Sequence, residues 1–399
     1  MERMYKIYLN EPIVEGNKVS FSWEPNYIFK DNKFCVQYLD VVNIGGSKNL
    51  LYQAYLPVCL ALAALGKVEV YLPGKISEAT LSGWKDLIKQ VSGKIYKRRC
   101  FIKIINGGVA VEDIEKIQLR ETGLLFGGGT ESLLMLGRLL DKKIKPYLLS
   151  LGGSGWLSSD PERNKVKFEQ DDLVAREFNL KLIRIRTNFR DLIDDKLWLH
   201  YLKKDTDILN SSLFLPFNVS MIYPVAEQLC IGEVVSGNEI ENNFGLGLYS
   251  FSSDATKALS EIPAEVKYKS YLNDSWKAEI VRNLHNLYPH IAKFQYSCTK
   301  NKNTRWCLKC EKCFRNYLIL KMYNIDCSKV GLDEEGIKMN LKLLTWKARN
   351  YIVRSKTARK MYSYIRREIS KSNDADLKKL LRQIYNAKLT IGRIIHAIV

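Results

Sequence analysis

The stretch that decides the fold runs from Gly123 to Leu140 and reads GLLFGGGTESLLMLGRLL. A short run suited to a buried strand leads into three consecutive glycines, and the leucines that follow recur on one face of a helix. Glycines let the backbone turn its N–H groups toward an anion, and a helix start adds unpaired N–H donors. This order of strand, glycines and helix predicts a phosphate site at Gly127, Gly128 and Gly129.

Three polar side chains complete this predicted site. Thr130 and Ser132 offer hydroxyl donors, and Glu131 offers a carboxylate that suits Mg²⁺. The loop matches neither the dinucleotide fingerprint GxGxxG nor the Walker A spacing GxxxxGK[ST]. A glycine-rich turn that binds nothing is the alternative interpretation.

The residues that follow continue the alternation of strand and helix. We predict strands at 146–151, 180–186 and 231–236, and helices at 161–178 and 217–230. Repeated β–α units imply an α/β fold with a doubly wound parallel sheet. Ligands in such sheets bind beyond the carboxyl ends of the strands. That edge would gather Gly127 to Ser132, Gly152 to Gly155, Thr187 and Gly237 to Glu239.

The first 118 residues predict an N-terminal α/β extension. Its expected strands are 5–9, 18–23, 34–42 and 67–72, and its expected helices are 51–65 and 77–91. The helix at 51–65 is the longest apolar stretch, but Gln53 and Pro57 interrupt it, so a buried helix is expected rather than a transmembrane segment. No secretory signal is evident.

Four cysteines lie in the spacing Cys298-x8-Cys307-x2-Cys310-x2-Cys313. Four thiolates can surround one tetrahedral Zn²⁺ and leave no position open for water, so zinc here would be structural. An iron–sulfur cubane also uses CxxCxxC with a distant cysteine and is the rival assignment; a site without metal is the third. The CxxCxxC run argues for a reducing compartment, so a cytoplasmic protein is expected. The scattered cysteines are expected to be buried and inert: Cys35, Cys59, Cys100, Cys230 and Cys327.

The glycine loop resembles the SGGxDS loop of the PP-loop ATP pyrophosphatase superfamily. Gly128, Gly129 and Ser132 match that pattern, whereas Gly127 stands where serine is usual and Glu131 where aspartate is usual. The cysteine spacing is similar to the zinc site of 7-cyano-7-deazaguanine synthases, the QueC group, and of muramoyl-peptide glutamate epimerases, the MurL group. The resemblance covers residues 120 to 325.

This resemblance implies an adenine-nucleotide α-hydrolase-like fold and an enzyme that uses ATP with Mg²⁺. A substrate oxygen, expected to be a carboxylate oxygen of a small molecule, would attack the α-phosphorus and release pyrophosphate. The implied nucleotide-binding residues are Gly127, Gly128, Gly129, Thr130, Ser132 and Gly237. The implied catalytic residues are Glu131, Ser132 and Glu239, with both glutamates on Mg²⁺. A tRNA-modifying enzyme of the same superfamily and an inactive nucleotide-binding homologue are the alternatives.

Residues 331–399 are strongly basic, with 16 Lys and Arg against 6 Asp and Glu. Two or three amphipathic helices are expected there, with a break at 370–374. Such charge suits tRNA or an anionic surface, although a solvated helical face is the plainer interpretation. The aromatic stretch Trp346 to Tyr364 could contact RNA or lipid headgroups, or face the core.

The chain of 399 residues is long enough for several domains. We divide it into the N-terminal extension (1–118), the PP-loop core (119–262), a helical region with the cysteine knuckle (263–330) and the basic helical tail (331–399). The sequence leaves the oligomeric state open, with a homodimer as one expectation.

Overall fold

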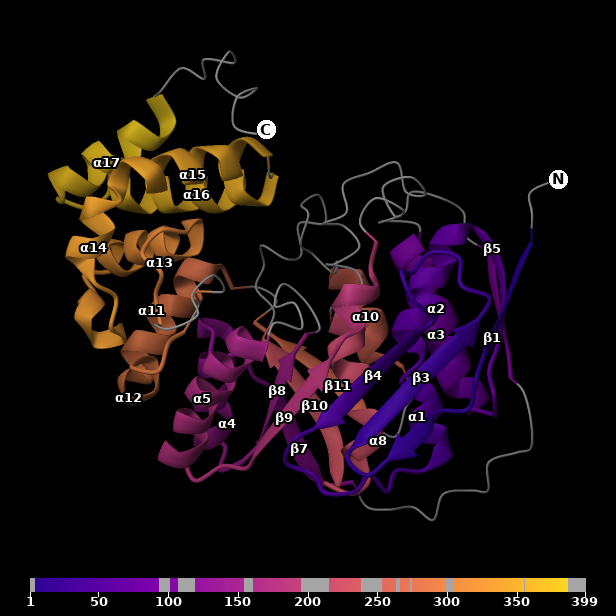
Figure 1. The fold of residues 1–399 in the computed structure, drawn as a ribbon. Helices are drawn as coiled ribbons and strands as arrows, with labels where there is room; N and C mark the ends of the chain where they lie inside the picture. The colour runs from indigo at the N-terminus through magenta and orange to yellow at the C-terminus, as the bar shows by residue number, and fades with distance from the viewer. Residues whose placement is uncertain are drawn as a thin grey trace.

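The computed structural model describes residues 4–92, 101–106, 119–153, 161–194, 215–237, 253–262, 266–272, 275–296, 298, 305–354 and 356–386. The described part is an α/β structure built on one mostly parallel sheet of eleven strands (Figure 1). From edge to edge the strand order is β11-β10-β7-β8-β9-β4-β3-β1-β5-β6, and β2 pairs with β3.

Five parallel strands form the half of the sheet that carries the glycine loop. They are β7 (Glu121–Leu125), β8 (Tyr147–Gly152), β9 (Leu182–Thr187), β10 (Ile231–Gly237) and β11 (Lys267–Tyr271). The first four confirm the predicted strands to within two residues. β11 corrects the expectation of a helical region beginning at 263. Its sequence KYKSY lies at the sheet edge and lacks the apolar run typical of a buried parallel strand.

The N-terminal residues extend this same sheet. β4 pairs antiparallel with β9, β3 and β1 continue antiparallel, and β5 and β6 run parallel to β1. The predicted strand at 34–42 ends at Tyr38, where a turn follows. These strands are β1 (Tyr5–Leu9), β2 (Ile13–Glu15), β3 (Lys18–Glu24), β4 (Lys33–Tyr38), β5 (Lys67–Tyr71) and β6 (Phe101–Ile105).

The apolar segment Lys48–Leu65 has the length and composition of a membrane-crossing helix, but 94% of it is buried inside the protein. The single helix predicted at 51–65 is divided in two, because Pro57 at the start of the second helix has no N–H to continue the first. The segment comprises α1 (Lys48–Gln53), α2 (Leu56–Leu62) and the 3₁₀ turn η1 (Ala63–Leu65).

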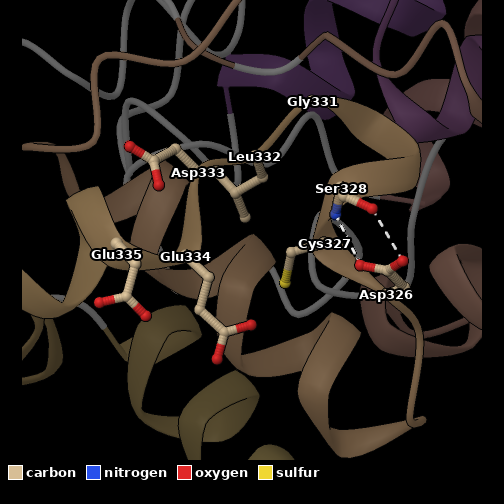
Figure 2. Close-up of a pocket in the computed structure, with 8 residues that line it drawn as sticks. All are labelled: Asp326, Cys327, Ser328, Gly331, Leu332, Asp333, Glu334 and Glu335. Carbon is tan, nitrogen blue, oxygen red and sulfur yellow. Dashed lines mark hydrogen bonds between the residues drawn. The ribbon is translucent and has the colours of Figure 1, made fainter.

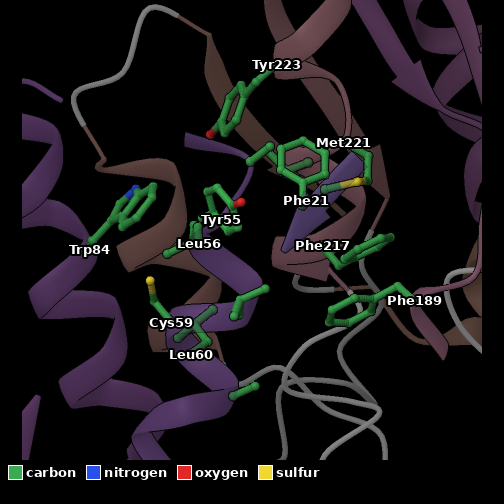
Figure 3. Close-up of a cluster of buried hydrophobic side chains, with 14 of the residues drawn as sticks. Phe21, Tyr55, Leu56, Cys59, Leu60, Trp84, Phe189, Phe217, Met221 and Tyr223 are labelled. Atoms are coloured by element: carbon green, nitrogen blue, oxygen red, sulfur yellow. The ribbon is translucent and has the colours of Figure 1, made fainter. Parts of the chain in front are cut away.

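A large aromatic core surrounds α2. Tyr55, Leu56 and Leu60 from α2 and its preceding turn face Trp84 of α3 (Glu78–Val91) and Phe21 of β3 (Figure 3). Phe189, in the 3₁₀ turn η3 (Phe189–Leu192) after β9, stacks on Phe217 at a centroid distance of 4.1 Å. Residues of both halves of the sheet therefore share one core.

The other face of the sheet carries a second core. In β8, Leu149 belongs to the aromatic core, while Leu148 packs with Leu133 and Leu136 of α4. Because alternate strand residues point to opposite faces, helices cover both faces of the sheet. The remaining helices of this half are α4 (Thr130–Asp141), α5 (Pro161–Glu177), α8 (Tyr223–Ala226), α10 (Ser253–Ser260), α11 (Lys277–Leu287) and α12 (Pro289–Ala292).

The C-terminal helices form a unit with its own core, visible at the upper left of Figure 1. Amphipathic helices with the predicted break at 370–374 are confirmed. The unit includes the cysteine array and comprises α13 (Glu311–Met322), η4 (Cys327–Val330), α14 (Glu334–Met339), α15 (Leu341–Arg354), α16 (Lys356–Ser370) and α17 (Ala375–Asn386).

Candidate nucleotide site and metal centre

The glycine loop lies at the one point where the order of the five parallel strands reverses. The chain runs from β7 through β8 to β9 across the sheet and then returns to place β10 on the other side of β7. The loop after β7 and the end of β10 are therefore neighbours: a Cβ added to Gly237 would lie 3.1 Å from both the Cβ and the carbonyl oxygen of Glu131. Any larger residue at 237 would require Glu131 to move by a few tenths of an ångström, so glycine suits this close approach.

Gly128 has a backbone conformation that favours glycine, with φ of 64°. Its carbonyl accepts a hydrogen bond of 2.8 Å from the backbone N–H of Tyr296. An added Cβ would lie 3.3 Å from Oδ1 of Asp171 and 3.5 Å from Cβ of Tyr296. The loop is therefore enclosed on one side by segments distant in the sequence.

Gly129 is the N-cap of α4, and no side chain among the described residues caps this helix. The first backbone N–H groups of α4 therefore lie at the carboxyl end of β7, where they could donate hydrogen bonds to an anion. Ser132 Oγ donates to Gly129 O at 3.0 Å, and Thr130 Oγ1 donates to Glu131 Oε2 at 3.2 Å. Both hydroxyls are thus engaged with the loop itself.

The loops that follow the parallel strands lie at one edge of the sheet, as predicted, where the structure describes them. β8 and β9 pair up to Gly152 and Arg186, so Gly153 and Thr187 follow side by side. The backbone N–H of Arg190 donates to Gly153 O at 3.2 Å. Ser154, Gly155, Asn238 and Glu239 lie outside the described residues.

Positive side chains collect beside the loop. Lys277 at the start of α11 is 7% exposed and forms an ion pair with Glu131. The pKa of Lys312 is lowered, chiefly by burial and then by the positive charges of Arg315 and Lys277. The carboxylates of Glu131 and Glu311 oppose this shift. Glu131, predicted as a magnesium ligand, is therefore held by a lysine in this structure.

A buried polar network lies beneath the loop. Lys167 of α5 contacts Asp171 Oδ2 at 2.7 Å and donates to Phe126 O at 3.3 Å, and Ser150 of β8 contacts both charged groups. Asp171 is fully buried, and burial raises its pKa while Lys167 and Ser150 oppose this. The network joins the end of β7 to β8 and α5.

Sequence reasoning missed the cationic residues Lys167, Lys277 and Lys312. Lys167 and Asp171 are four residues apart on a predicted helix, which is a recognisable pairing signal. That spacing alone does not distinguish a buried pair from an exposed one. Nothing in the local sequence indicates that Lys277 lies beside the glycine loop, because only the packing of α11 on α4 brings it there.

The four predicted cysteine ligands converge. Their sulfur atoms all lie within 4.8 Å of one another, with separations of 4.0 Å for Cys298–Cys310, 3.8 Å for Cys307–Cys313 and 3.4 Å for Cys310–Cys313. A tetrahedral ion with metal–sulfur bonds of about 2.3 Å holds its ligands about 3.8 Å apart. The array could therefore hold one metal ion such as Zn²⁺. A four-iron cubane would hold the thiolates farther apart.

Mutual repulsion explains why a cation suits this array. Three of the four thiols are buried and all four sulfur atoms lie within 4.8 Å of one another, so their thiolate charges would repel one another strongly. Ionising all four thiols together is thus unfavourable unless a divalent cation balances their charge.

The cysteine array is connected to the glycine loop. Cys298 lies two residues after Tyr296, whose backbone N–H donates a hydrogen bond to Gly128 O. The neighbouring Gln295 is fully buried and donates to Asn316 Oδ1 of α13 at 2.9 Å. Lys312 lies between Cys310 and Cys313, so the fold of the knuckle also determines where this cation lies.

The remaining cysteines agree only in part with the prediction. Cys59 and Cys327 are buried, and burial raises their thiol pKa to about 12 and about 11. Cys35 is half-buried, whereas Cys230 is exposed, which corrects the expectation for that residue. Cys230 follows α8 in a turn with φ of 53°, outside the core. Cys100 lies outside the described residues.

An acidic hollow of about 420 Å³ lies near α14, apart from the glycine loop (Figure 2). Its carboxylates already have structural partners. Asp326 accepts from Ser328 N at 2.9 Å, Asp333 caps α14 through Gly336 N at 3.1 Å, and Glu334 pairs with Lys321 at 3.1 Å. We therefore assign this hollow no catalytic function.

Comparisons of the chain with protein-family models, with curated proteins and with solved structures found no match. The functional interpretation consequently depends on the geometry of the loop and on the chemistry of its neighbours.

Proposed function

We propose that the chain binds ATP with Mg²⁺ at the junction of β7 and β10 and adenylates a carboxylate oxygen of a small molecule. One observation carries the proposal: the triple-glycine loop, the uncapped start of α4 and Gly237 meet where the strand order reverses. In open α/β sheets this crevice is the usual ligand site. The order of the five strands is also that of doubly wound, nucleotide-binding sheets.

The charges around the loop suit a polyphosphate. Backbone N–H groups at Gly128 and Gly129 would face the phosphates, and the cations Lys277 and Lys312 would balance their charge. In the complex, the carboxylate of Glu131 would hold Mg²⁺ instead of Lys277, and the ammonium of Lys277 would then pair with a phosphate oxygen. Glu239 keeps its proposed role as a second magnesium ligand.

The reaction itself needs no covalent bond to the protein. A carboxylate oxygen of the substrate attacks the α-phosphorus, the bond to the α–β bridging oxygen breaks, and pyrophosphate leaves with that electron pair. The products are an acyl adenylate and pyrophosphate. The protein would supply position and electrostatic stabilisation, which are the main contributions to phosphoryl and nucleotidyl transfer.

The metal knuckle would have a structural role in this scheme. Four cysteine ligands leave no open coordination position, so a bound ion such as Zn²⁺ would not act on the substrate. Its effect would be to fix Lys312 and the segment that holds Gly128. The proposed compartment remains the cytoplasm, where thiols stay reduced.

Nucleotide binding without catalysis is the second candidate. The ion pair between Glu131 and Lys277 favours it, because a carboxylate held by lysine is not free to bind magnesium. Release of pyrophosphate from ATP, measured with a panel of carboxylic acids, separates the two.

The test uses one charge-removing variant and a matched control. Glu131→Gln should abolish pyrophosphate release, whereas Glu121→Gln, at the exposed start of β7 and at the far end of that strand from the glycine loop, should leave it unchanged. Full activity of the Glu131→Gln variant would refute the metal role. Binding of ATP with no pyrophosphate release from any acid would favour the second candidate.

A further inference from the structure

Helix α15 is apolar on two opposite faces. Leu344 and Ala348 are fully buried against the C-terminal core. On the other side, Leu343, Trp346 and Val353 are 40%, 54% and 50% exposed. A surface helix normally turns its apolar face to the core and a polar face to water, so the exposed Leu343, Trp346 and Val353 lack a cover within the described residues.

The exposed apolar residues of α15 lie on one side of this helix. Trp346 and Val353 follow three and ten positions after Leu343, spacings that keep side chains on one side of a helix, and the polar Asn350 lies between them. Met339, at the end of the preceding helix α14, is 80% exposed. Four of the twelve large apolar residues that the described chain exposes are therefore Met339, Leu343, Trp346 and Val353, which we call the α15 outer face. A cluster of exposed large apolar side chains of this kind marks an interaction site.

Basic residues flank the α15 outer face on both sides. Lys342 is exposed on one flank, and Lys347 lies on the other, where its Nζ donates to Lys309 O at 2.6 Å. The only acidic residue one turn from Met339 among the described residues is Glu335, and Lys338 pairs with it at 2.8 Å. The adjacent helix α16 adds the exposed cations Arg359, Lys360, Arg366 and Arg367.

We propose that the α15 outer face binds the surface of an anionic lipid bilayer. Its layout is that of an interfacial helix: Trp346 lies among exposed apolar side chains, and Lys342 and Lys347 flank them, where lysine side chains could contact headgroup phosphates. The excess of basic residues in 331–399 supplies attraction to negative lipid. Nucleic acid is the less suitable partner, because phosphate contacts need cations but not exposed Met, Leu and Val. This proposal is independent of the nucleotide site.

The test is co-sedimentation of the full chain with vesicles. Phosphatidylcholine vesicles with phosphatidylserine should bind the protein, and vesicles of phosphatidylcholine alone should bind it much more weakly. Trp346→Gln should weaken binding roughly tenfold, because it removes a large apolar group from the interface. Lys342→Gln should weaken it about fivefold, since one cation near an anionic surface contributes that factor.

Matched controls distinguish binding through the α15 outer face from nonspecific adsorption to vesicles. Phe101→Gln alters an equally exposed aromatic residue, 57% exposed, in β6 of the sheet, and should leave vesicle binding unchanged. Circular dichroism and bound-metal content should match the wild type in all variants. The proposal is overturned if the wild-type protein does not bind anionic vesicles or if the Trp346→Gln variant binds them as the wild type does. It is also overturned if Trp346→Gln instead abolishes a dimer or RNA binding.

Discussion

Replacing Lys167 with methionine tests whether the buried pair beneath the glycine loop holds this part of the fold together. The side chain of Lys167 is 7% exposed and that of Asp171 is 0% exposed, so water cannot compensate for a lost partner. Methionine keeps the length and apolar stem of lysine but removes its charge. The carboxyl of Asp171 would then be left as an unpaired buried charge or would take up a proton.

The expected cost follows from the burial of the pair. Removing one partner of a buried ion pair costs about 3–5 kcal/mol. For a chain of 399 residues that loss corresponds to a fall in melting temperature of about 4–6 °C. Replacing both partners, as in Lys167→Met with Asp171→Leu, should recover most of the loss, because neither charge then remains buried alone.

Denaturant unfolding of the wild type, both single variants and the double variant measures the coupling between the two residues. Arg176→Met is the matched control, since Arg176 and Asp172 form a pair with the same spacing in the same helix but with the arginine 77% exposed. That control should cost less than about 1 kcal/mol. Equal effects of Lys167→Met and Arg176→Met would refute the reasoning.

Three further predictions concern the metal, the loop and pH. Cys310→Ser should lower the content of bound metal and weaken ATP binding together, because the knuckle holds the segment that binds Gly128; unchanged ATP affinity with metal lost would contradict this. Lys277→Met should lower pyrophosphate release by roughly tenfold or more through loss of a phosphate partner, as steady-state kinetics would show. Burial lowers the pKa of His285. The unfolded chain therefore binds the proton more readily, so stability should fall as pH drops below about 6.5; His285→Asn should flatten this dependence in thermal melts.

The sequence predicted the elements that carry strong local patterns. The strand at 231–236 was predicted from Ile231, Val234 and Val235, which are β-branched and buried, whereas its pairing with β7 was not predicted. The break at 370–374 was also readable, because polar residues separate two amphipathic repeats. The convergence of Cys307, Cys310 and Cys313 followed from two CxxC spacings, each of which suits a tight turn around one ion.

Other features depend on tertiary contacts that no local pattern records. β11 is a short edge strand with two lysines, so nothing in its sequence distinguishes it from a loop or a helix end. The ion pair between Glu131 and Lys277 joins residues 146 positions apart. The exposure of Trp346 and burial of Tyr362 also depend on which side of each helix faces the C-terminal core. The pattern of aromatic and basic residues at 346–364 left two interpretations open, a contact surface for RNA or lipid headgroups and a face turned to the core.

The measurement that tests the central claim most directly is calorimetric titration with Mg²⁺ and α,β-methylene ATP, which cannot be cleaved at the α–β bridge. We predict one saturable site per chain in the wild type. Gly237→Val should lose it, because the new side chain would fill the space 3.1 Å from Glu131. Absence of binding at two temperatures, or equal affinity in a Gly237→Val variant that retains its metal, would contradict the claim.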